Sequence, residues 1–345
     1  MKRLILTILT VLFVLCLFAC GKSDDKTATP TVTPAVTQEG TNMNENTEPT
    51  KQIELTVTET PTPTPSPTEA PKTDENGMYL TCPSSYLAKK EGVTYSKFEH
   101  KTYYSYYCER ERGYTILLPA DYTEDKKYPV VYLLHGIFGD ENSFAGDAKL
   151  PILIGNMVAE GLCEEFILVC PAMYAAGPDT AQTPAMNAEA CIPYDRFATE
   201  LVECLMPHIN ATYSVRTDRE GTNIGGFSMG GRETLYTVIL HPEYFKYVCA
   251  MAPAPGITAT KDKFMEHPGS LTEDEVRFAA GATIPDKIII CCGTRDSVVG
   301  TYPKTYHELF EKNGIAHIWY EVPGADHDMT TQYSGMFNFF QLIGK

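Results

Sequence analysis

The sequence predicts a single α/β domain over residues 78–345, built on a mostly parallel sheet that helices cover on both faces. Three observations predict it. Residues 21–77 contain no Phe, Tyr or Trp, whereas residues 78–345 hold all 21 Tyr and the only Trp. Apolar runs of strand length alternate with segments of helical spacing along this second part, which is typical of a parallel sheet. About 270 residues are also enough to bury a sizeable core as one domain.

Residues 1–20 are interpreted as an export signal rather than as part of the domain. A basic start with Lys2 and Arg3 precedes an apolar stretch at 4–19, which is shorter than the ~20 residues that span a bilayer. Residues 17–20 (Leu-Phe-Ala-Cys) resemble a bacterial lipobox, which implies lipidation of Cys20. We therefore expect an exported protein that a lipid anchor holds to the membrane at the cell surface. Secretion without the lipid and an uncleaved anchor are the alternatives.

Residues 21–77 are expected to be a disordered linker between this anchor and the domain. They contain 15 Thr and 8 Pro, and Thr alternates with Pro near residues 60–71, which favours an extended chain. They carry too little apolar surface to offset the entropy lost on folding. The formal net charge of −16 argues against nucleic acid as a partner of the whole chain, because nucleic-acid-binding proteins need a basic face.

The elements of the domain are expected in alternating order. Strands are predicted from short apolar runs, most of them suited to burial on both faces of a sheet, at 114–119, 128–134, 166–170, 222–227, 247–251, 287–292 and 317–322. Helices are predicted from apolar residues at helical spacing and from Pro or Asn-Gly at their ends, at 195–211, 232–240, 302–312 and 335–343. Tyr103, Tyr104, Tyr106 and Tyr107 alternate as in a half-buried strand, with stacking on sugars as the alternative.

The sequence Gly-Phe-Ser-Met-Gly at residues 226–230 fits the pattern G-x-S-x-G between a predicted strand and a predicted helix. In that context the pattern marks a tight turn that exposes a serine hydroxyl above the strand ends, where the helix N-terminus adds positive potential. We therefore predict that Ser228 is a nucleophile. The alternative is a Gly-rich turn that lets the helix pack closely on the strand.

A serine nucleophile needs backbone N–H groups that point at the developing oxyanion. One donor is expected from the residue after the nucleophile, Met229, and the second from the loop after an early strand. Residues 133–139 form such a strand end and loop, so we assign Ile137 as the second donor. His135 is expected to brace this loop rather than to act as a base.

A base and an acid should follow the serine in the chain, in the order Asp or Glu and then His. Among the later histidines, only His327 lies in a loop just beyond a predicted strand end, which places it on the same sheet edge as Ser228. Asp296 follows the strand 287–292 in the same way and is expected to orient His327. Asp326 and Asp328 are interpreted as solvated acids of the loop.

The cysteines give no metal site and no unique disulfide pattern. Nine Cys lie in the domain, so at least one is unpaired in any scheme within the chain. Cys82 with Cys108, or Cys163 with Cys191, are possible bridges between which the sequence does not choose. No Cys or His pair has the spacing of a zinc site, and no nucleotide motif is present, so we expect neither a metal nor another cofactor.

These residues together resemble the esterase-D-like α/β-hydrolases, specifically the feruloyl and acetylxylan esterases of carbohydrate esterase family 1. The resemblance spans roughly residues 95–343, with matching stretches at 128–136, 200–209, 218–221, 226–231, 241–245, 292–296 and 326–328. It implies the α/β-hydrolase fold and a serine esterase that hydrolyses feruloyl or acetyl decorations on plant cell-wall polysaccharide such as xylan. The family usually has an aromatic residue where Met329 stands here.

Several alternatives stay open at this point. An enterochelin-type esterase or a surface acyltransferase of the same fold would share the catalytic residues, and a lipid-anchored module that only binds glycan would not use them. The segment 173–194 is long and follows a strand end, so it could line the acyl pocket, act as a lid or simply connect two elements. The sequence fixes neither the acyl group, the sugar nor the oligomeric state.

Overall fold

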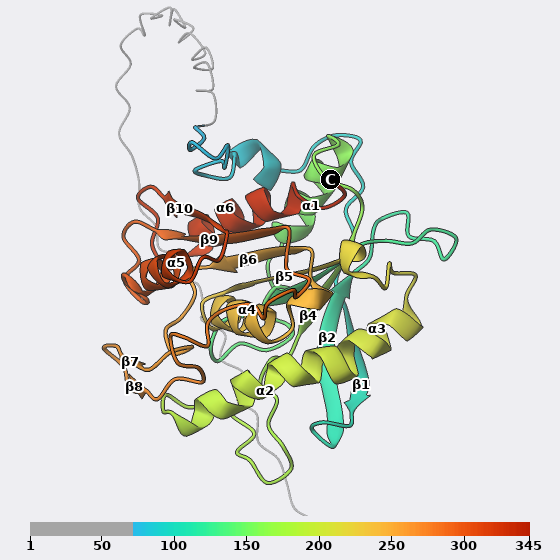
Figure 1. The fold of residues 1–345 in the computed structure, drawn as a ribbon. Coiled ribbons are helices and arrows are strands. Elements are labelled where there is room, and N and C mark those ends of the chain that lie inside the picture. The colour runs from blue at the N-terminus through green and yellow to red at the C-terminus, as the bar shows by residue number, and fades with distance from the viewer. Residues whose placement is uncertain (1–71) are drawn as a thin grey trace, which may run out of the picture. The chain divides into compact units, whose positions relative to one another are not determined.

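A computed structural model describes residues 72–345 (Figure 1). The expected export signal, Cys20 and all of the expected linker up to residue 71 lie outside the described residues. Within residues 72–345, none of the helices combines the length and the apolar character that a membrane span needs.

One eight-stranded sheet forms the centre of the domain, with strand order β1-β2-β4-β3-β5-β6-β9-β10. The first two strands run antiparallel to their neighbours, and all other neighbouring pairs are parallel. The strands are β1 (Glu99–Ser105), β2 (Arg110–Leu117), β3 (Val130–Leu134), β4 (Ile167–Pro171), β5 (Thr222–Phe227), β6 (Tyr247–Met251), β9 (Lys287–Gly293) and β10 (Ile318–Val322). A separate two-stranded hairpin, β7 (Thr260–Lys261) and β8 (Glu266–His267), lies in the connection between β6 and β9.

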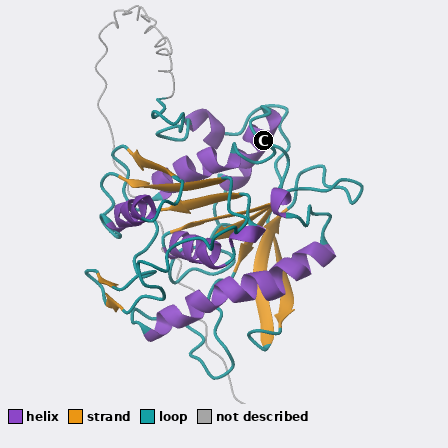
Figure 2. Ribbon diagram, viewed as in Figure 1, coloured by secondary structure: helices purple, strands orange, loops and turns teal. Residues whose placement is uncertain are grey.

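Helices cover both faces of this sheet (Figure 2). One face packs against α2 (Ile192–Glu200), a π-helical turn (Leu201–Leu205), α3 (Met206–Thr212), α4 (Met229–Leu240) and α5 (Tyr302–Lys312). The other packs against α1 (Leu150–Ala159) and α6 (Met329–Phe340). Short 3₁₀ turns lie at Ser84–Leu87, Glu189–Cys191, Arg219–Gly221 and Pro242–Tyr244. Every residue of β3, β4, β5 and β6 is buried, as expected for parallel strands between two helical layers.

The structure differs from the expected elements at identifiable places. The helix α1 was not expected, because its sequence is apolar nearly throughout and shows no helical alternation. The predicted helix 195–211 begins at Ile192 and contains the π-helical turn. The closing helix begins at Met329 rather than at 335, because the Asp328 side chain caps it by accepting from Thr330 N and Thr331 N.

The domain also begins earlier than the expected boundary at residue 78. Asp74 Oδ1 accepts a hydrogen bond from Met78 N (2.7 Å), which closes a turn within the expected linker. Tyr79 N then donates to Asn338 Oδ1 (2.9 Å) on α6. Residues 72–77 therefore belong with the domain. The hydrogen bond from Met78 N to Asp74 fixes their turn, and the adjacent Tyr79 is bonded to α6.

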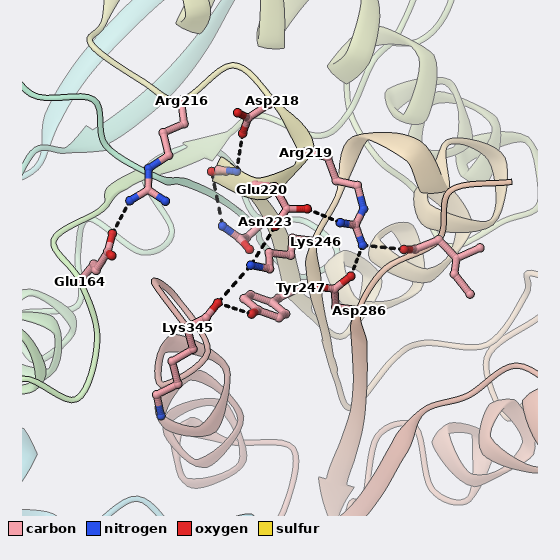
Figure 3. A network of polar contacts seen from close by, with 12 residues as sticks. Glu164, Arg216, Asp218, Arg219, Glu220, Asn223, Lys246, Tyr247, Asp286 and Lys345 are labelled. Carbon is pink, nitrogen blue, oxygen red and sulfur yellow. Dashed lines mark hydrogen bonds and ion pairs between the residues drawn. The ribbon is translucent and has the colours of Figure 1, made fainter.

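Charged side chains gather at the edge of the sheet where the central parallel strands begin (Figure 3). Arg219 pairs with Glu220 and Asp286, and Lys246 pairs with Glu220 at 2.9 Å. Lys246 Nζ and Tyr247 Oη both donate to Lys345 O, at 3.0 and 2.7 Å. These contacts tie the segments before β5, β6 and β9 to one another, so this network serves the architecture of the sheet at the edge away from Ser228.

Candidate active site

Ser228 forms the single-residue turn between β5 and α4. Its φ of 59° and ψ of −117° are a strained conformation for a residue with a side chain, costing on the order of 1–3 kcal/mol. Backbone hydrogen bonds hold the turn: Ser228 N donates to Met251 O (2.9 Å), and Ser228 O accepts from Arg232 N (3.0 Å) and Ala254 N (2.9 Å). The turn therefore has the strained strand-to-helix geometry that the G-x-S-x-G pattern predicts.

Two glycines allow neighbouring backbone segments to pack closely around this turn. A Cβ on Gly226 would lie 2.3 Å from Gly230 O, and a Cβ on Gly230 would lie 2.1 Å from Leu134 O. Because both obstacles are backbone atoms, no side chain fits at either position. Gly230 thus brings the first turn of α4 against the end of β3, so the two segments predicted to supply the oxyanion donors are packed together.

His327 and Asp296 lie together on the loops that follow β10 and β9. His327 Nδ1 is 2.8 Å from Asp296 Oδ2, and the carboxylate can only accept, so Nδ1 carries the proton and Nε2 is left to act as a base. The His327 ring also packs on the ring of Phe227, the residue before Ser228, with 4.4 Å between centroids. The structure therefore places His327 and Asp296 together at the carboxyl edge of the sheet, next to the turn that carries Ser228.

The carboxylate of Asp296 is held by more than His327. Its Oδ1 accepts from Val298 N (2.9 Å) and Val299 N (2.8 Å). Burial by itself would raise the pKa of Asp296, but the hydrogen bonds from His327 and from the two backbone N–H groups hold it below its ordinary value. Asp296 is therefore an anion positioned to orient the imidazole and to stabilise its charged form.

The two acids beside His327 have structural partners. Asp326 Oδ1 accepts from Ser297 N (2.6 Å) and from His327 N (2.7 Å), which joins the loop of Asp296 to the loop of His327. Asp328 caps α6. The interpretation of both as merely solvated acids was therefore incomplete, because each holds backbone N–H groups next to the site.

His135 braces the loop after β3. Its Nδ1 lies 2.7 Å from Gly136 O, and its Nε2 accepts from Met173 N (3.2 Å). The carbonyl can only accept, so these two partners fix the neutral tautomer with the proton on Nδ1. Burial lowers the pKa of His135, which agrees with a neutral ring. His135 is thus a brace rather than a base, as expected.

The predicted oxyanion donor Ile137 lies between Gly136, which is close to Ser228, and Phe138, whose N–H is hydrogen-bonded. A Cβ on Gly136 would lie 3.6 Å from Ser228 Cβ, so the loop passes directly beside the nucleophile. Phe138 has a left-handed φ of 62°, and its N–H donates to Tyr194 Oη at 3.2 Å. Sequence reasoning missed Tyr194, because this contact joins the loop after β3 to helix α2, far apart in the chain.

The segment after β4 is fixed at its beginning and lines a cavity. Arg112 donates to Ala172 O and to Tyr174 O (2.8 Å), and Ala175 N donates to Pro193 O (3.0 Å). The segment, the start of β2 and the loop after β3 line a cavity of about 330 Å³. We name residues 135–141 the oxyanion loop for their predicted role. The cavity is lined by Arg110, Glu111, Arg112, Gly113, His135, Gly139, Asp140, Glu141, Ala172, Tyr174, Gln182 and Pro184. Part of the segment 173–194 therefore lines a cavity beside the oxyanion loop.

A buried ionic cluster lies one helical turn after Ser228. Arg232, 2 % exposed, contacts Glu233 and also Asp195 on α2, and its guanidinium donates to Gly256 O (2.9 Å). Burial raises the pKa of Glu233 to about 8, against the opposing pull of Arg232. The cluster ties α4 to α2 and to the connection between β6 and β9.

All nine cysteines within residues 72–345 are free, so neither of the two possible bridges is formed. Seven of them are buried as small apolar side chains, and Cys82 and Cys191 are half-buried. Within the same residues, the structure brings no group of three or more His, Cys, Asp or Glu side chains into an arrangement suited to a metal ion.

Comparison with known proteins gives one family and a consistent set of relatives. The model of the family described as "Putative esterase" matches residues 105–328. A solved CE1 ferulic acid esterase from Anaeromyces mucronatus, in complex with ferulic acid, is 45 % identical; the match covers 77 % of this chain and 97 % of that chain, with a TM-score of 0.74. The fold is therefore that of the α/β-hydrolases.

Two curated relatives are larger proteins. An endo-1,4-beta-xylanase/feruloyl esterase from Xylanibacter ruminicola is 25 % identical over 167 residues, which cover 47 % of this chain and 22 % of the relative. Endo-1,4-beta-xylanase Y from Acetivibrio thermocellus is 28 % identical over 147 residues, covering 39 % of this chain and 12 % of the relative. The matched regions are thus less than a quarter of the length of either relative.

Proposed function

Because the chain belongs to this esterase family and is a carboxylic ester hydrolase, we propose that it is a serine esterase that removes feruloyl groups from xylan. The single observation that carries the proposal is the hydrogen bond between Asp296 and His327 beside the strained Ser228 turn. The 45 % identity to a ferulic acid esterase supports the choice of acyl group.

In the proposed reaction, His327 Nε2 takes the proton of Ser228 as its Oγ attacks the ester carbonyl carbon. The N–H groups of Met229 and Ile137 hold the resulting oxyanion. The bond from the carbonyl carbon to the sugar oxygen then breaks, and His327 returns the proton to that oxygen. Water, deprotonated by His327, attacks the acyl-enzyme and releases ferulate with the free serine.

Apolar side chains exposed around the catalytic edge support an aromatic acyl group over acetyl. Six large exposed hydrophobic side chains lie on segments that follow the carboxyl ends of β3, β4, β6, β9 and β10: Phe138 (58 % exposed), Met186 (41 %), Ile192 (57 %), Phe264 (48 %), Val298 (40 %) and Met329 (38 %). Exposed apolar side chains on the segments at this edge of the sheet are available to contact an apolar part of a ligand. An acetyl group is too small to use such a surface, whereas a hydroxycinnamoyl ring and its chain would contact it.

The acyl preference is tested with two esters that share a leaving group, 4-nitrophenyl ferulate and 4-nitrophenyl acetate. We expect a higher kcat/KM for the ferulate, since only the acyl group differs. A higher value for the acetate would identify an acetyl esterase instead. Release of ferulate from feruloylated arabinoxylan then tests the polysaccharide.

The nucleophile is tested with Ser228→Ala. We expect wild type to be labelled by a fluorophosphonate and Ser228→Ala to lose both labelling and ~10³-fold or more of kcat. The control is Ser85→Ala, which changes an exposed serine far along the chain from the catalytic loops. Full activity in Ser228→Ala would refute the assignment, and an unlabelled wild type would favour a module that only binds glycan.

We also propose, from residues 1–20 alone, that the protein is exported and anchored to membrane lipid at the cell surface through Cys20. Metabolic labelling with palmitate should mark the wild-type protein and should be lost in Cys20→Ser. Labelling that survives this substitution would contradict the proposal, and an unlabelled protein in the medium would indicate plain secretion.

A further inference from the structure

The hairpin of β1 and β2 extends away from the rest of the sheet (Figure 1). Tyr114 of β2 pairs with Pro171, the last residue of β4, so the four residues of β2 before Tyr114 extend beyond the end of β4. The strand β4 runs parallel to β3, and β3 runs parallel to β5. The turn of the hairpin therefore lies on the same side of the sheet as Ser228.

Two tyrosines near this turn are exposed and contact each other. Tyr104 is 52 % exposed and Tyr106 is 81 % exposed, and their ring centroids lie 5.3 Å apart. Tyr103 points the other way, is 5 % exposed and stacks on His208. The expectation of a half-buried strand thus holds for Tyr103 and Tyr104, which alternate on β1, but is wrong for Tyr106 and Tyr107, which lie in the turn after it.

The exposed pair adjoins the cavity beside the oxyanion loop. Tyr104 is the direct cross-strand partner of Glu111, and Glu111 lines that cavity of about 330 Å³. The same cavity is lined by Gly139 and His135 of the loop that passes beside Ser228. The polar cavity therefore lies between the strand that carries Tyr104 and the loop that passes beside the nucleophile.

The chemistry of the tyrosine pair and of this cavity fits a carbohydrate. Aromatic rings provide flat apolar faces onto which the carbon–hydrogen faces of a sugar ring can pack, and the two Tyr hydroxyls can bond to its rim. The cavity offers charged and amide groups that donate to or accept from hydroxyls, namely Arg110, Glu111, Asp140, Glu141 and Gln182. Both charge signs occur among these groups, which suits a neutral, hydroxyl-rich ligand rather than an ion.

We propose that Tyr104 and Tyr106, together with this cavity, bind the main chain of the polysaccharide that carries the scissile ester. This inference rests on the proposed function. In the strand order, β1 and β5 are separated by four spacings between neighbouring strands. At ~4.8 Å per spacing, the tyrosine pair lies roughly 20 Å from the nucleophile. Only a ligand several sugars long reaches both places, and a small ester such as methyl ferulate does not.

Direct binding is measured first, with an unsubstituted xylohexaose and the Ser228→Ala protein, by calorimetry. We expect the double substitution Tyr104→Ala and Tyr106→Ala in this background to weaken binding by about tenfold or more, the loss of one good stacking contact. The control is Tyr244→Ala, which removes a tyrosine that is 38 % exposed near the start of β6, at the opposite edge. Equal affinity in the double variant, or an equal loss in the control, would overturn the proposal.

Kinetics in the active protein separate this inference from the proposed function. In the double variant we expect KM for feruloylated arabinoxylan to rise about tenfold, while kcat and KM for methyl ferulate stay within about twofold. Unchanged kinetics on the polysaccharide would overturn the hairpin site and leave the esterase intact. A wild-type protein that hydrolyses neither feruloyl substrate would instead refute the proposed function, and xylohexaose binding would still report on the hairpin. Circular dichroism checks that both variants are folded.

Discussion

Removal of one oxygen atom from Tyr194 should slow catalysis without weakening substrate binding. The Tyr194 side chain is fully buried, and its hydroxyl accepts the N–H of Phe138, whose left-handed backbone follows Ile137, the proposed oxyanion donor. In Tyr194→Phe the Phe138 N–H loses its hydrogen-bond partner. If this N–H stays buried, the free energy of unfolding falls by on the order of 1–3 kcal/mol. The loop can recover part of this by shifting, and the shift moves Ile137 N–H away from the oxyanion.

The size of the effect follows from the contribution of one oxyanion donor. Loss of such a donor lowers kcat by about 10²–10³-fold, so a displaced donor should lower kcat by roughly tenfold, or ~1.4 kcal/mol of transition-state stabilisation. KM should stay within about twofold, since the donor acts on charge that develops only in the transition state. Initial rates with 4-nitrophenyl ferulate and urea unfolding measure both effects.

Tyr132→Phe is the matched control for this change. Tyr132 lies on β3, which leads into the same loop, and its hydroxyl is buried with no hydrogen-bond partner among the described residues. The control should keep kcat and lose no stability. If Tyr194→Phe loses stability but keeps kcat, its hydroxyl supports only the fold; if both variants lose kcat equally, the effect is not specific to Phe138.

Three further outcomes are expected. Asp296→Asn should lower kcat by on the order of 10³–10⁴-fold in a protein with unchanged circular dichroism, because an amide does not fix the His327 tautomer; a loss below tenfold would contradict this role. Gly230→Ala should destabilise the fold by more than ~3 kcal/mol in urea, since its Cβ would meet Leu134 O at 2.1 Å, and a stable, active variant would show that the close approach is not needed. Burial lowers the pKa of His135, so its ring stays neutral in the folded protein, whereas in the unfolded chain the ring takes up a proton below pH ~6.5. The free energy of unfolding should therefore fall from pH 7 to pH 5, and less steeply in His135→Gln; equal slopes would exclude a contribution from His135.

The sequence predicts where the candidate catalytic residues lie because these residues stand at strand ends. Ser228 carries a local motif, and His327 and Asp296 each follow a short apolar run that is a strand in the structure. In a parallel sheet the ends of such runs meet at one edge, so chain order and position are enough to place the three residues together. The roles of Met229 and Ile137 stay predictions that rest on the loops in which they lie.

Residues that support the site from elsewhere in the chain could not be predicted. Tyr194 contacts the oxyanion loop only through the tertiary fold, whereas the bracing role of His135 could be predicted because His135 lies in that loop. The helix α1 was missed because nearly uniform apolar sequence has no period to detect. The alternation of Tyr103 and Tyr104 predicted a half-buried strand, but not that the strand would end at Ser105 and leave Tyr106 and Tyr107 in a turn.

The low reactivity of the native cysteines makes the domain suitable for labelling at a single introduced cysteine. Burial raises the pKa of half-buried Cys82 to about 12 and that of Cys191 above its ordinary value, so neither thiol forms a reactive thiolate at neutral pH. A cysteine introduced at the exposed position Thr102, on the same face of β1 as Tyr104, should therefore react with maleimide ahead of the native thiols of residues 72–345. A fluorophore attached there would report the arrival of a sugar chain in real time, without any ester being cleaved.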